Sequence, residues 1–195
     1  TMMAVIVEQL EPNATAGGAG DRRLYTYDPS GLWTTSVEIK LNATRSLKRD
    51  IAYDTAFETM SQVSNWYAVV GGTNAAAPQL TRYRYDEHGR LSTVLEPGDT
   101  DAAPSTEYQY KLADPASQIL ALQRSSASSG QDIASATCLD GRGRVFQTRA
   151  KVNDTTWQVS GFTEYDSRGA VVREFQPWTS TSGACETMPP ANVPF

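Results

Sequence analysis

Short runs in which apolar and polar residues alternate, each ending in a turn that contains aspartate and glycine, follow one another along most of this chain. In LTRYRYDEHGRLSTVL, residues 80–95, Tyr83 and Tyr85 lie two positions apart and therefore on one face of a strand, because strand side chains alternate with period 2. The run RLSTVL that follows Gly89 is rich in β-forming residues and predicts a second strand that returns antiparallel. The pattern predicts a β-hairpin.

The turn between these two strands has its own chemistry. Asp86 opens the turn, since an aspartate carboxylate can accept the backbone N–H two residues further on. Gly89, three residues later, supplies the positive φ that closes a loop built from a type I turn and a bulge.

The same unit recurs along the chain. Tyr-Asp with a glycine three residues after the aspartate occurs three times in full, and degenerate copies have Leu139 in the tyrosine position, Phe57 in the glycine position and Lys111 in the aspartate position. The six aspartate positions, 28, 54, 86, 111, 140 and 166, lie 25 to 32 residues apart, which indicates an internal repeat. The predicted turn residues are Tyr27, Asp28 and Gly31; Tyr53 and Asp54; Tyr85, Asp86 and Gly89; Asp140 and Gly143; and Tyr165, Asp166 and Gly169.

Six units of two strands each predict roughly 10 to 14 strands in an all-β fold, a curved antiparallel sheet of successive β-hairpins. Residues 43–60 come nearest to a helical pattern, but a Tyr-Asp pair falls inside them and we interpret them as strand. Loops rich in Gly, Pro, Ala and Ser separate the units at residues 71–79, 96–105 and 124–132. Because open sheet edges invite aggregation, we expect the sheet to continue into more protein.

The chain is expected to have three regions: an N-terminal strand and linker at residues 1–20, the repeat sheet at 21–178, and a tail rich in Pro, Ser and Thr at 179–195. The opening TMMAVIVEQLEP lacks the basic region of a signal peptide and predicts a strand. Since the chain opens on Thr1 without a leader, we expect a segment of a longer protein.

Composition narrows the class of protein. The 195 residues carry a net charge of −5, a pI of about 4.9 and no basic stripe, which disfavours a nucleic-acid partner. No apolar run approaches the roughly 20 residues of a membrane span. Cys138 and Cys185 lack the spacing of a metal site. A free buried thiol is the favoured interpretation of Cys138, and a disulfide between the two cysteines remains open.

Residues for catalysis or cofactor binding are sparse. His88, the single histidine, lies in a turn, where histidines are usually solvated. No G-x-S-x-G sequence frames a serine, and the glycine-rich stretches lack the Lys-Ser/Thr of a phosphate loop. Asp99 and Asp101 offer only two acids toward calcium. We therefore expect a protein that is not an enzyme, without catalytic, cofactor or metal site; a hydrolase would need a clustered acid–base pair.

Aromatic residues and sequons keep a second function class open. Tryptophans on strand faces usually pack within the sheet but can also form sugar-binding platforms. The three Asn-x-Thr sequons are glycan acceptors only in a eukaryotic secreted protein. The tryptophans are Trp33, Trp66, Trp157 and Trp178, and the sequon asparagines are Asn13, Asn42 and Asn153.

At these residues the chain resembles the YD-repeat, or Rhs (rearrangement hotspot), family. YRYDEHGRLSTVLEPGDT and YDSRGAVVREFQPW match its Y-x-Y-D-x-x-G-R-L-x-x-V pattern. The block from Cys138 to Trp178 looks most like the middle region of the B component of insecticidal toxin complexes and related virulence-plasmid proteins. The likeness covers about residues 20 to 178.

This resemblance implies a β-sheet that spirals into a hollow shell around a toxic C-terminal segment, and hence a structural, non-catalytic role. It implies a secreted, extracellular or bacterial cell-surface location. The implied partners are the rest of the shell-forming polypeptide or a C-terminal toxin component whose aspartyl autoprotease frees the cargo, with a pore-forming component as a further candidate.

The chain departs from a complete member of the family. It is too short to close a shell, and YDPSGLW at residues 27–33 is interpreted as a turn rather than a cleavage signature. The alternative is an extracellular adhesion or carbohydrate-binding module, as in teneurin-like cell-surface proteins that share these repeats.

Overall fold

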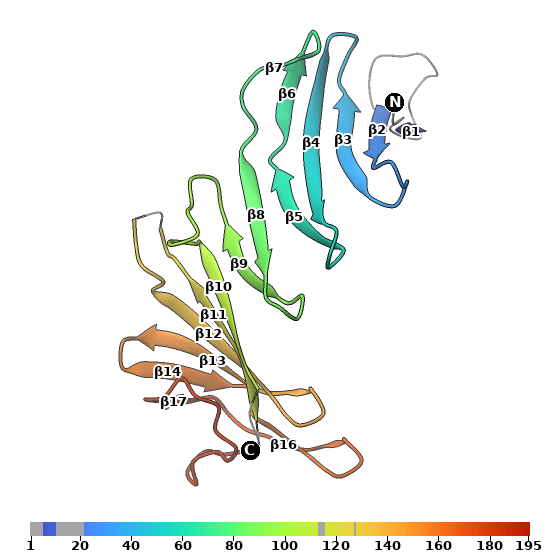
Figure 1. Cartoon of the computed structure of the whole chain (residues 1–195). Helices are drawn as coiled ribbons and strands as arrows, with labels where there is room; N and C mark the ends of the chain where they lie inside the picture. The colour runs from blue at the N-terminus through green and yellow to red at the C-terminus, as the bar shows by residue number, and fades with distance from the viewer. Residues whose placement is uncertain (1–5, 11–21, 113–115, 127) are drawn as a thin grey trace. The chain divides into compact units, whose positions relative to one another are not determined.

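The computed structural model of the chain describes residues 6–10, of which only the backbone is considered, and residues 22–112, 116–126 and 128–195. Every regular element of these residues is a β-strand, and the strand pairs are antiparallel and connected mostly by hairpins (Figure 1). The prediction of an all-β fold built from successive hairpins is confirmed. Contacts divide the chain into two compact units, Thr1–Thr100 and Asp101–Phe195.

The first unit is a sheet in which chain order and strand order nearly coincide. Its order is β1-β2-β3-β4-β5-β8-β9, with β6 paired to the first half of β4 and β7 paired to β6 (Figure 1). The strands are β1 (Ile6–Leu10), β2 (Arg22–Tyr27), β3 (Thr34–Lys40), β4 (Arg45–Asp54), β5 (Thr59–Ser64), β6 (Tyr67–Val70), β7 (Thr73–Asn74), β8 (Leu80–Tyr85) and β9 (Leu91–Leu95).

The second unit repeats this arrangement. Its sheet has the order β10-β11-β12-β13-β14-β17, and β15 and β16 form a separate two-stranded hairpin. The strands are β10 (Thr106–Lys111), β11 (Ser117–Gln123), β12 (Ile133–Leu139), β13 (Val145–Asn153), β14 (Thr156–Ser160), β15 (Thr163–Tyr165), β16 (Val171–Glu174) and β17 (Trp178–Ser180).

The described residues thus form seventeen strands, more than the roughly 10 to 14 that two strands per repeat imply. One of the additional strands, β7, lies in residues 71–79, where the sequence predicts a loop. Gly71 and Gly72 both have positive φ, as a two-residue hairpin turn requires, and β7 therefore folds back onto β6. Residues 43–60 are confirmed as strand, because β4 and β5 lie on either side of a turn.

The N-terminal end of the chain is described in part and the C-terminal end in full. Residues 6–10 form β1, so the predicted N-terminal strand is present there, whereas the predicted linker at residues 11–20 lies outside the described residues. Trp178–Ser180 form β17, and residues 181–195 contain no strand.

The second unit contains a connected aromatic core. Phe162 makes edge-on contacts with Phe146 and Phe175, at ring-centroid distances of 5.7 and 5.5 Å. Val159 is fully buried against this cluster. Burial of one side chain of this size stabilises a fold by about 1.5–3 kcal/mol, so burial of the cluster contributes to the stability of this unit.

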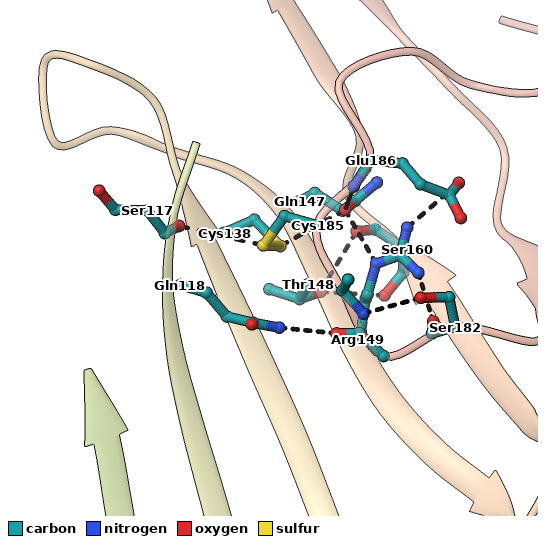
Figure 2. Close-up of a disulfide and its surroundings, with 12 residues drawn as sticks. Ser117, Gln118, Cys138, Gln147, Thr148, Arg149, Ser160, Ser182, Cys185 and Glu186 are labelled. Atoms are coloured by element: carbon teal, nitrogen blue, oxygen red, sulfur yellow. Dashed lines mark hydrogen bonds and ion pairs between the residues drawn. A yellow bond between two sulfur atoms is a disulfide. The ribbon is translucent and has the colours of Figure 1, made fainter. Parts of the chain in front are cut away.

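Cys138 and Cys185 form a disulfide across 47 residues (Figure 2). The interpretation of Cys138 as a free thiol is therefore wrong, although its burial is confirmed because its exposure is 0%. The reason lies in the path of the C-terminal residues, which fold back over β12 and bring Cys185 onto the face where Cys138 lies.

Candidate functional site: the repeat turns and the contacts between them

Five turns at the predicted positions share one construction, and we call them the repeat turns. In four of them the glycine N–H donates to the carbonyl of the aspartate three residues earlier, at 2.9–3.0 Å, and the glycine φ lies between 74° and 91°. We call the residue with positive φ the left-handed residue. The aspartates and left-handed residues are Asp28 and Gly31, Asp54 and Glu58, Asp86 and Gly89, Asp140 and Gly143, and Asp166 and Gly169.

The aspartate side chain holds each turn together. At Asp86, Asp140 and Asp166, the carboxylate Oδ1 accepts the backbone N–H of the residue two positions later and of the residue four positions later, each at 2.9 Å. One carboxylate oxygen thereby satisfies two backbone donors that the turn geometry leaves without a ladder partner. The negative charge of these aspartates therefore stabilises the turns in which they lie.

These bonds favour the ionised carboxylate. At Asp140 and Asp166 the N–H of the residue four positions later is the main cause that holds the pKa of the carboxyl below its usual value. At Asp86 partial loss of water raises the pKa, but the bonds from the Arg90 backbone and guanidinium outweigh it and the net shift is downward. Arg90 and Arg144 also pair with the aspartates of their own turns at 2.7 Å.

The first repeat turn closes one residue later than these three. The Asp28 Oδ1 accepts the N–H groups of Leu32 and Trp33 at 2.9 and 2.8 Å. The Ser30 hydroxyl donates to the other carboxylate oxygen and is the main cause that lowers the Asp28 pKa.

The second repeat turn lacks glycine, and the sequence interpretation of its residues needs a correction. Phe57 does not take the glycine position: the left-handed residue is Glu58, with φ of 55°, so this turn is one residue longer. The Asp54 Oδ1 still accepts the N–H of Ala56 at 2.8 Å. A side chain in this conformation costs about 1–2 kcal/mol relative to glycine.

Two repeat positions have a different outcome. Lys111, predicted in the aspartate position, is the last residue of β10, and residues 113–115, where its turn would close, lie outside the described residues. Leu139, in the tyrosine position, ends β12 next to a register shift and is partly buried.

The tyrosine before the turn aspartate connects one repeat to the repeat before it. The Tyr85 hydroxyl donates to the Met60 carbonyl at 2.7 Å, and the Tyr165 hydroxyl donates to the Val145 carbonyl at 3.2 Å. In both cases the acceptor stands two residues after the left-handed residue of the preceding repeat turn. The two contacts are therefore equivalent, although one lies in each unit.

A third tyrosine reaches the same position through a tilted contact between two rings. Tyr53 packs on Trp33 with ring centroids 4.9 Å apart, and Trp33 again stands two residues after a left-handed residue, here that of the first repeat turn. A tyrosine thus contacts the same position of the preceding repeat at three places, by a hydrogen bond at two of them and by its ring at the third.

A second kind of contact joins consecutive repeat turns directly. Phe57 covers Gly89, where an added Cβ would lie 3.0 Å from the Phe57 ring. The Arg142 guanidinium donates to the Ser167 carbonyl at 3.1 Å and lies beside Gly169. Phe57 and Arg142 both directly precede a left-handed residue, so this contact also follows the repeat.

Neither inter-repeat contact was foreseen from the sequence, which assigned tyrosine, aspartate and glycine to turns alone. A usable signal was present, because tyrosine directly precedes the turn aspartate in four of the five repeat turns. Leu139 is the exception.

The residues considered for catalysis or metal binding, His88 and Asp99, each have a local structural environment. His88 has a side chain that is 62% exposed, and its Nε2 lies 3.6 Å from the Glu87 carboxylate. The Asp99 Oδ2 accepts the Glu96 N–H at 2.9 Å and so closes a loop turn. Within the described ranges, no group of three or more His, Cys, Asp or Glu side chains is arranged to hold a metal ion.

The tryptophans serve different roles. Trp178 is buried in the core of the second unit, Trp157 packs against Gly183, and Trp66 is 41% exposed. The sequon residue Asn42 lies in an exposed turn, and Asn153 is the exposed last residue of β13. The Oδ1 of each accepts the N–H of the sequon threonine. Asn13 lies outside the described residues.

One open groove of about 490 Å³ lies beside the last two repeat turns. Phe146, Phe162 and Val172 form its apolar lining. Arg144, at its polar side, lies 4.0 Å above the Tyr165 ring and pairs with its own turn aspartate. The arginine is therefore already engaged by the fold.

Comparison with known proteins gives no relative for this chain: no family model, no curated protein and no solved structure matches it. Over the part of the chain that the structure describes, no helix has the length and apolar character of a membrane span.

Proposed function

We propose that this chain is a non-catalytic structural segment of a YD-repeat shell that encapsulates a toxin or other C-terminal cargo in a secreted toxin-delivery protein. The observation that carries the proposal is the recurring contact between consecutive repeats. A tyrosine of one repeat reaches the residue two positions after the left-handed residue of the repeat before it, at Trp33, Met60 and Val145. A shell wall built from successive hairpins needs a contact of this kind between each repeat and the next.

The last repeat supports a continuing wall. By the same counting, Val171 is the position where the tyrosine of a following repeat would bind. This residue is 59% exposed, compared with 47% for Val145, whose carbonyl a tyrosine already binds. Arg168 is the position that would cover the next left-handed residue, and its side chain is 88% exposed. The partner that fits these positions is another repeat hairpin, from the same polypeptide or from a C-terminal toxin component, with a pore-forming component as a further candidate.

The use of the turn aspartates also favours a structural role. Their carboxylates bind backbone N–H groups of their own turns, which lowers their pKa and keeps them ionised near neutral pH. A general acid would need the opposite shift, toward a higher pKa.

Limited proteolysis of the intact native gene product, read by mass spectrometry, tests this proposal. An enclosing shell predicts a downstream fragment that is cut free from the chain yet stays resistant to protease until the protein is denatured. A downstream region that is digested at once would contradict the proposal and favour the adhesion or carbohydrate-binding module, for which glycan binding is the next measurement.

A pair of variants shows whether this chain is the protecting wall. Asp166→Ala removes the carboxylate that holds the last repeat turn and should make the cargo accessible to protease. Asp154→Ala is the matched control, because Asp154 lies in a β13–β14 turn outside the repeat and its side chain is 97% exposed. Equal protection in the two variants would argue against a wall built from repeat turns.

A further inference from the structure

Residues 181–195, which we call the C-terminal strap, cross the sheet of the second unit. The strand register places the residues beneath the strap on one face, because directly paired residues of antiparallel strands share a face. Figure 2 shows Ser182, Cys185 and Glu186 of the strap beside Gln118, Cys138, Gln147 and Arg149 of the sheet. The residues beneath the strap come from four consecutive strands: Gln118 of β11, Cys138 of β12, Gln147 and Arg149 of β13, and Trp157 of β14.

A buried cation is the centre of the noncovalent contacts. Arg149 is only 1% exposed. Its Nη1 donates to the Ser182 carbonyl at 2.6 Å, and its Nη2 forms an ion pair with Glu186 at 3.2 Å (Figure 2). Both partners belong to the strap, so the strap supplies the charge balance of this guanidinium.

Further contacts determine how closely the strap approaches the sheet and which strap residues lie above which strands. Gln118 donates to the Gly183 carbonyl at 2.6 Å, and the Glu186 N–H donates to the Gln147 side-chain oxygen at 3.2 Å. A Cβ at Gly183 would lie 2.6 Å from the Trp157 ring, so only glycine allows this close approach. The strap is therefore seated on a surface that fits it.

The disulfide is the single covalent bond in this arrangement. Cys138 is fully buried, whereas Cys185 is partly exposed within the strap. The strap residues around Cys185 are largely exposed, among them Ser182, Ala184 and Thr187.

Residues 189–195 have further anchors, because Val193 packs against the aromatic core, the Phe195 ring lies 5.7 Å from the Phe175 ring and the Gln176 N–H donates to the Pro194 carbonyl at 2.9 Å. Residues 181–188 depend more on the disulfide, since most of them are exposed, and such a segment opens locally at a lower free energy than the sheet beneath it.

We propose that the Cys138–Cys185 disulfide is a redox-sensitive lock on the C-terminal strap, which holds the strap closed when oxidised and allows it to open when reduced. This inference rests on the strap contacts alone and stands whether or not the chain is part of a shell. The signal is transfer from an oxidising compartment to one where thiols are kept reduced.

The chemistry is thiol–disulfide exchange with a low-molecular-weight thiol as the reductant. Its thiolate attacks the sulfur of Cys185, the S–S bond breaks, and the electron pair leaves on the Cys138 sulfur, which takes up a proton. A second thiol then displaces the mixed disulfide, so two small thiols become one small disulfide and the protein gains two thiols. The strap is afterwards held by the Arg149 contacts and its remaining noncovalent contacts.

Hydrogen exchange with mass spectrometry on the full chain, with and without a dithiol reductant, tests the lock. We expect the amides of residues 181–188 to exchange at least about tenfold faster after reduction, while the amides of β11, β12 and β13 keep their rates. The variant that carries both Cys138→Ser and Cys185→Ser should exchange like the reduced protein, and the reductant should leave it unchanged.

Two glutamate variants separate the lock from the ion pair. Glu186→Gln should accelerate strap exchange further in the reduced protein and have little effect in the oxidised protein, where the disulfide keeps the strap closed. Glu174→Gln on β16 is the matched control and should change neither. Unchanged strap exchange on reduction would overturn the proposal, and so would equal acceleration of β11 to β13, since the disulfide would then stabilise the whole unit rather than lock one segment.

Discussion

Gly89→Ala compared with Gly31→Ala isolates the contact between consecutive repeat turns. Both glycines have φ of 74° and both lie in the first unit, so an alanine meets the same backbone strain at either place. They differ in their surroundings: a Cβ at Gly89 would lie 3.0 Å from the Phe57 ring, whereas a Cβ at Gly31 meets nothing within 4 Å.

The expected magnitudes follow from these distances. The left-handed conformation costs about 1–2 kcal/mol for a residue with a Cβ, and this loss of stability should appear in both variants. Gly89→Ala should lose about 0.5 to 1 kcal/mol more, which is less than the usual overpacking cost of a buried core because the Phe57 ring is 43% exposed and can move. For a unit of this size, 1 kcal/mol corresponds to about 4–8 °C in the melting temperature.

Urea unfolding followed by tryptophan fluorescence gives the free energies, with hydrogen exchange of residues 80–95 as a local readout. Repeating Gly89→Ala in a Phe57→Ala background completes a double-mutant cycle. In that background the additional loss at Gly89 should disappear. If Gly89→Ala and Gly31→Ala are equally destabilising, or if Phe57→Ala leaves their difference intact, the contact between the turns contributes no stability and the reasoning fails.

Four further predictions concern the repeat turns, the tyrosine contact between repeats and the buried arginine beneath the strap. Tyr85→Phe should lower the free energy of unfolding by about 0.5–1.5 kcal/mol in urea titrations through loss of the bond to the preceding repeat, with Tyr83→Phe close to wild type. Glu58→Gly should raise it by about 1 kcal/mol, because glycine relieves the left-handed strain; a lower urea midpoint would exclude this backbone assignment. The turn aspartates have lowered pKa values in the folded protein, so their contribution to stability is complete above the unfolded pKa of about 3.9 and is lost as pH falls through the folded pKa. The urea concentration at the unfolding midpoint should therefore decrease once the pH is lowered below about 4. The decrease with pH should be smaller in Asp166→Asn. Arg149→Met should lower the thermal midpoint of the oxidised protein, since it leaves the strap glutamate without its buried partner, and an unchanged midpoint would show that the pair is neutral to stability.

The hairpin architecture could be predicted because its determinants are local. An aspartate that accepts nearby N–H groups and a glycine that supplies positive φ define a turn within five residues, whatever the rest of the chain does. The recurrence of this turn was therefore enough to predict an all-β, antiparallel fold without helix.

The contacts that the sequence did not reveal depend on segments that are distant in the chain. Cys138 meets Cys185 only because residues 181–195 fold back over β12, and no local pattern encodes this return. Glu58 shows a different difficulty: a residue other than glycine occupies a left-handed position, so a search for glycine placed the turn one residue too early.

The tyrosine contact between repeats was predictable in part, because it depends on both local spacing and the pairing of neighbouring hairpins. Its residues stand at fixed distances from the turn, but the meaning of those distances becomes visible only when neighbouring hairpins are placed side by side. Tyr85 and Tyr165 then prove to be equivalent because each donates to the carbonyl at the same position of the preceding repeat.

Cryo-electron microscopy of the intact native gene product tests the central proposal most directly. The account predicts a hollow particle with the sheet of this chain in its wall, density inside the cavity, and a further hairpin whose tyrosine lies at the Val171 carbonyl. An open sheet that encloses nothing, with the edge at Val171 exposed to solvent, would contradict it.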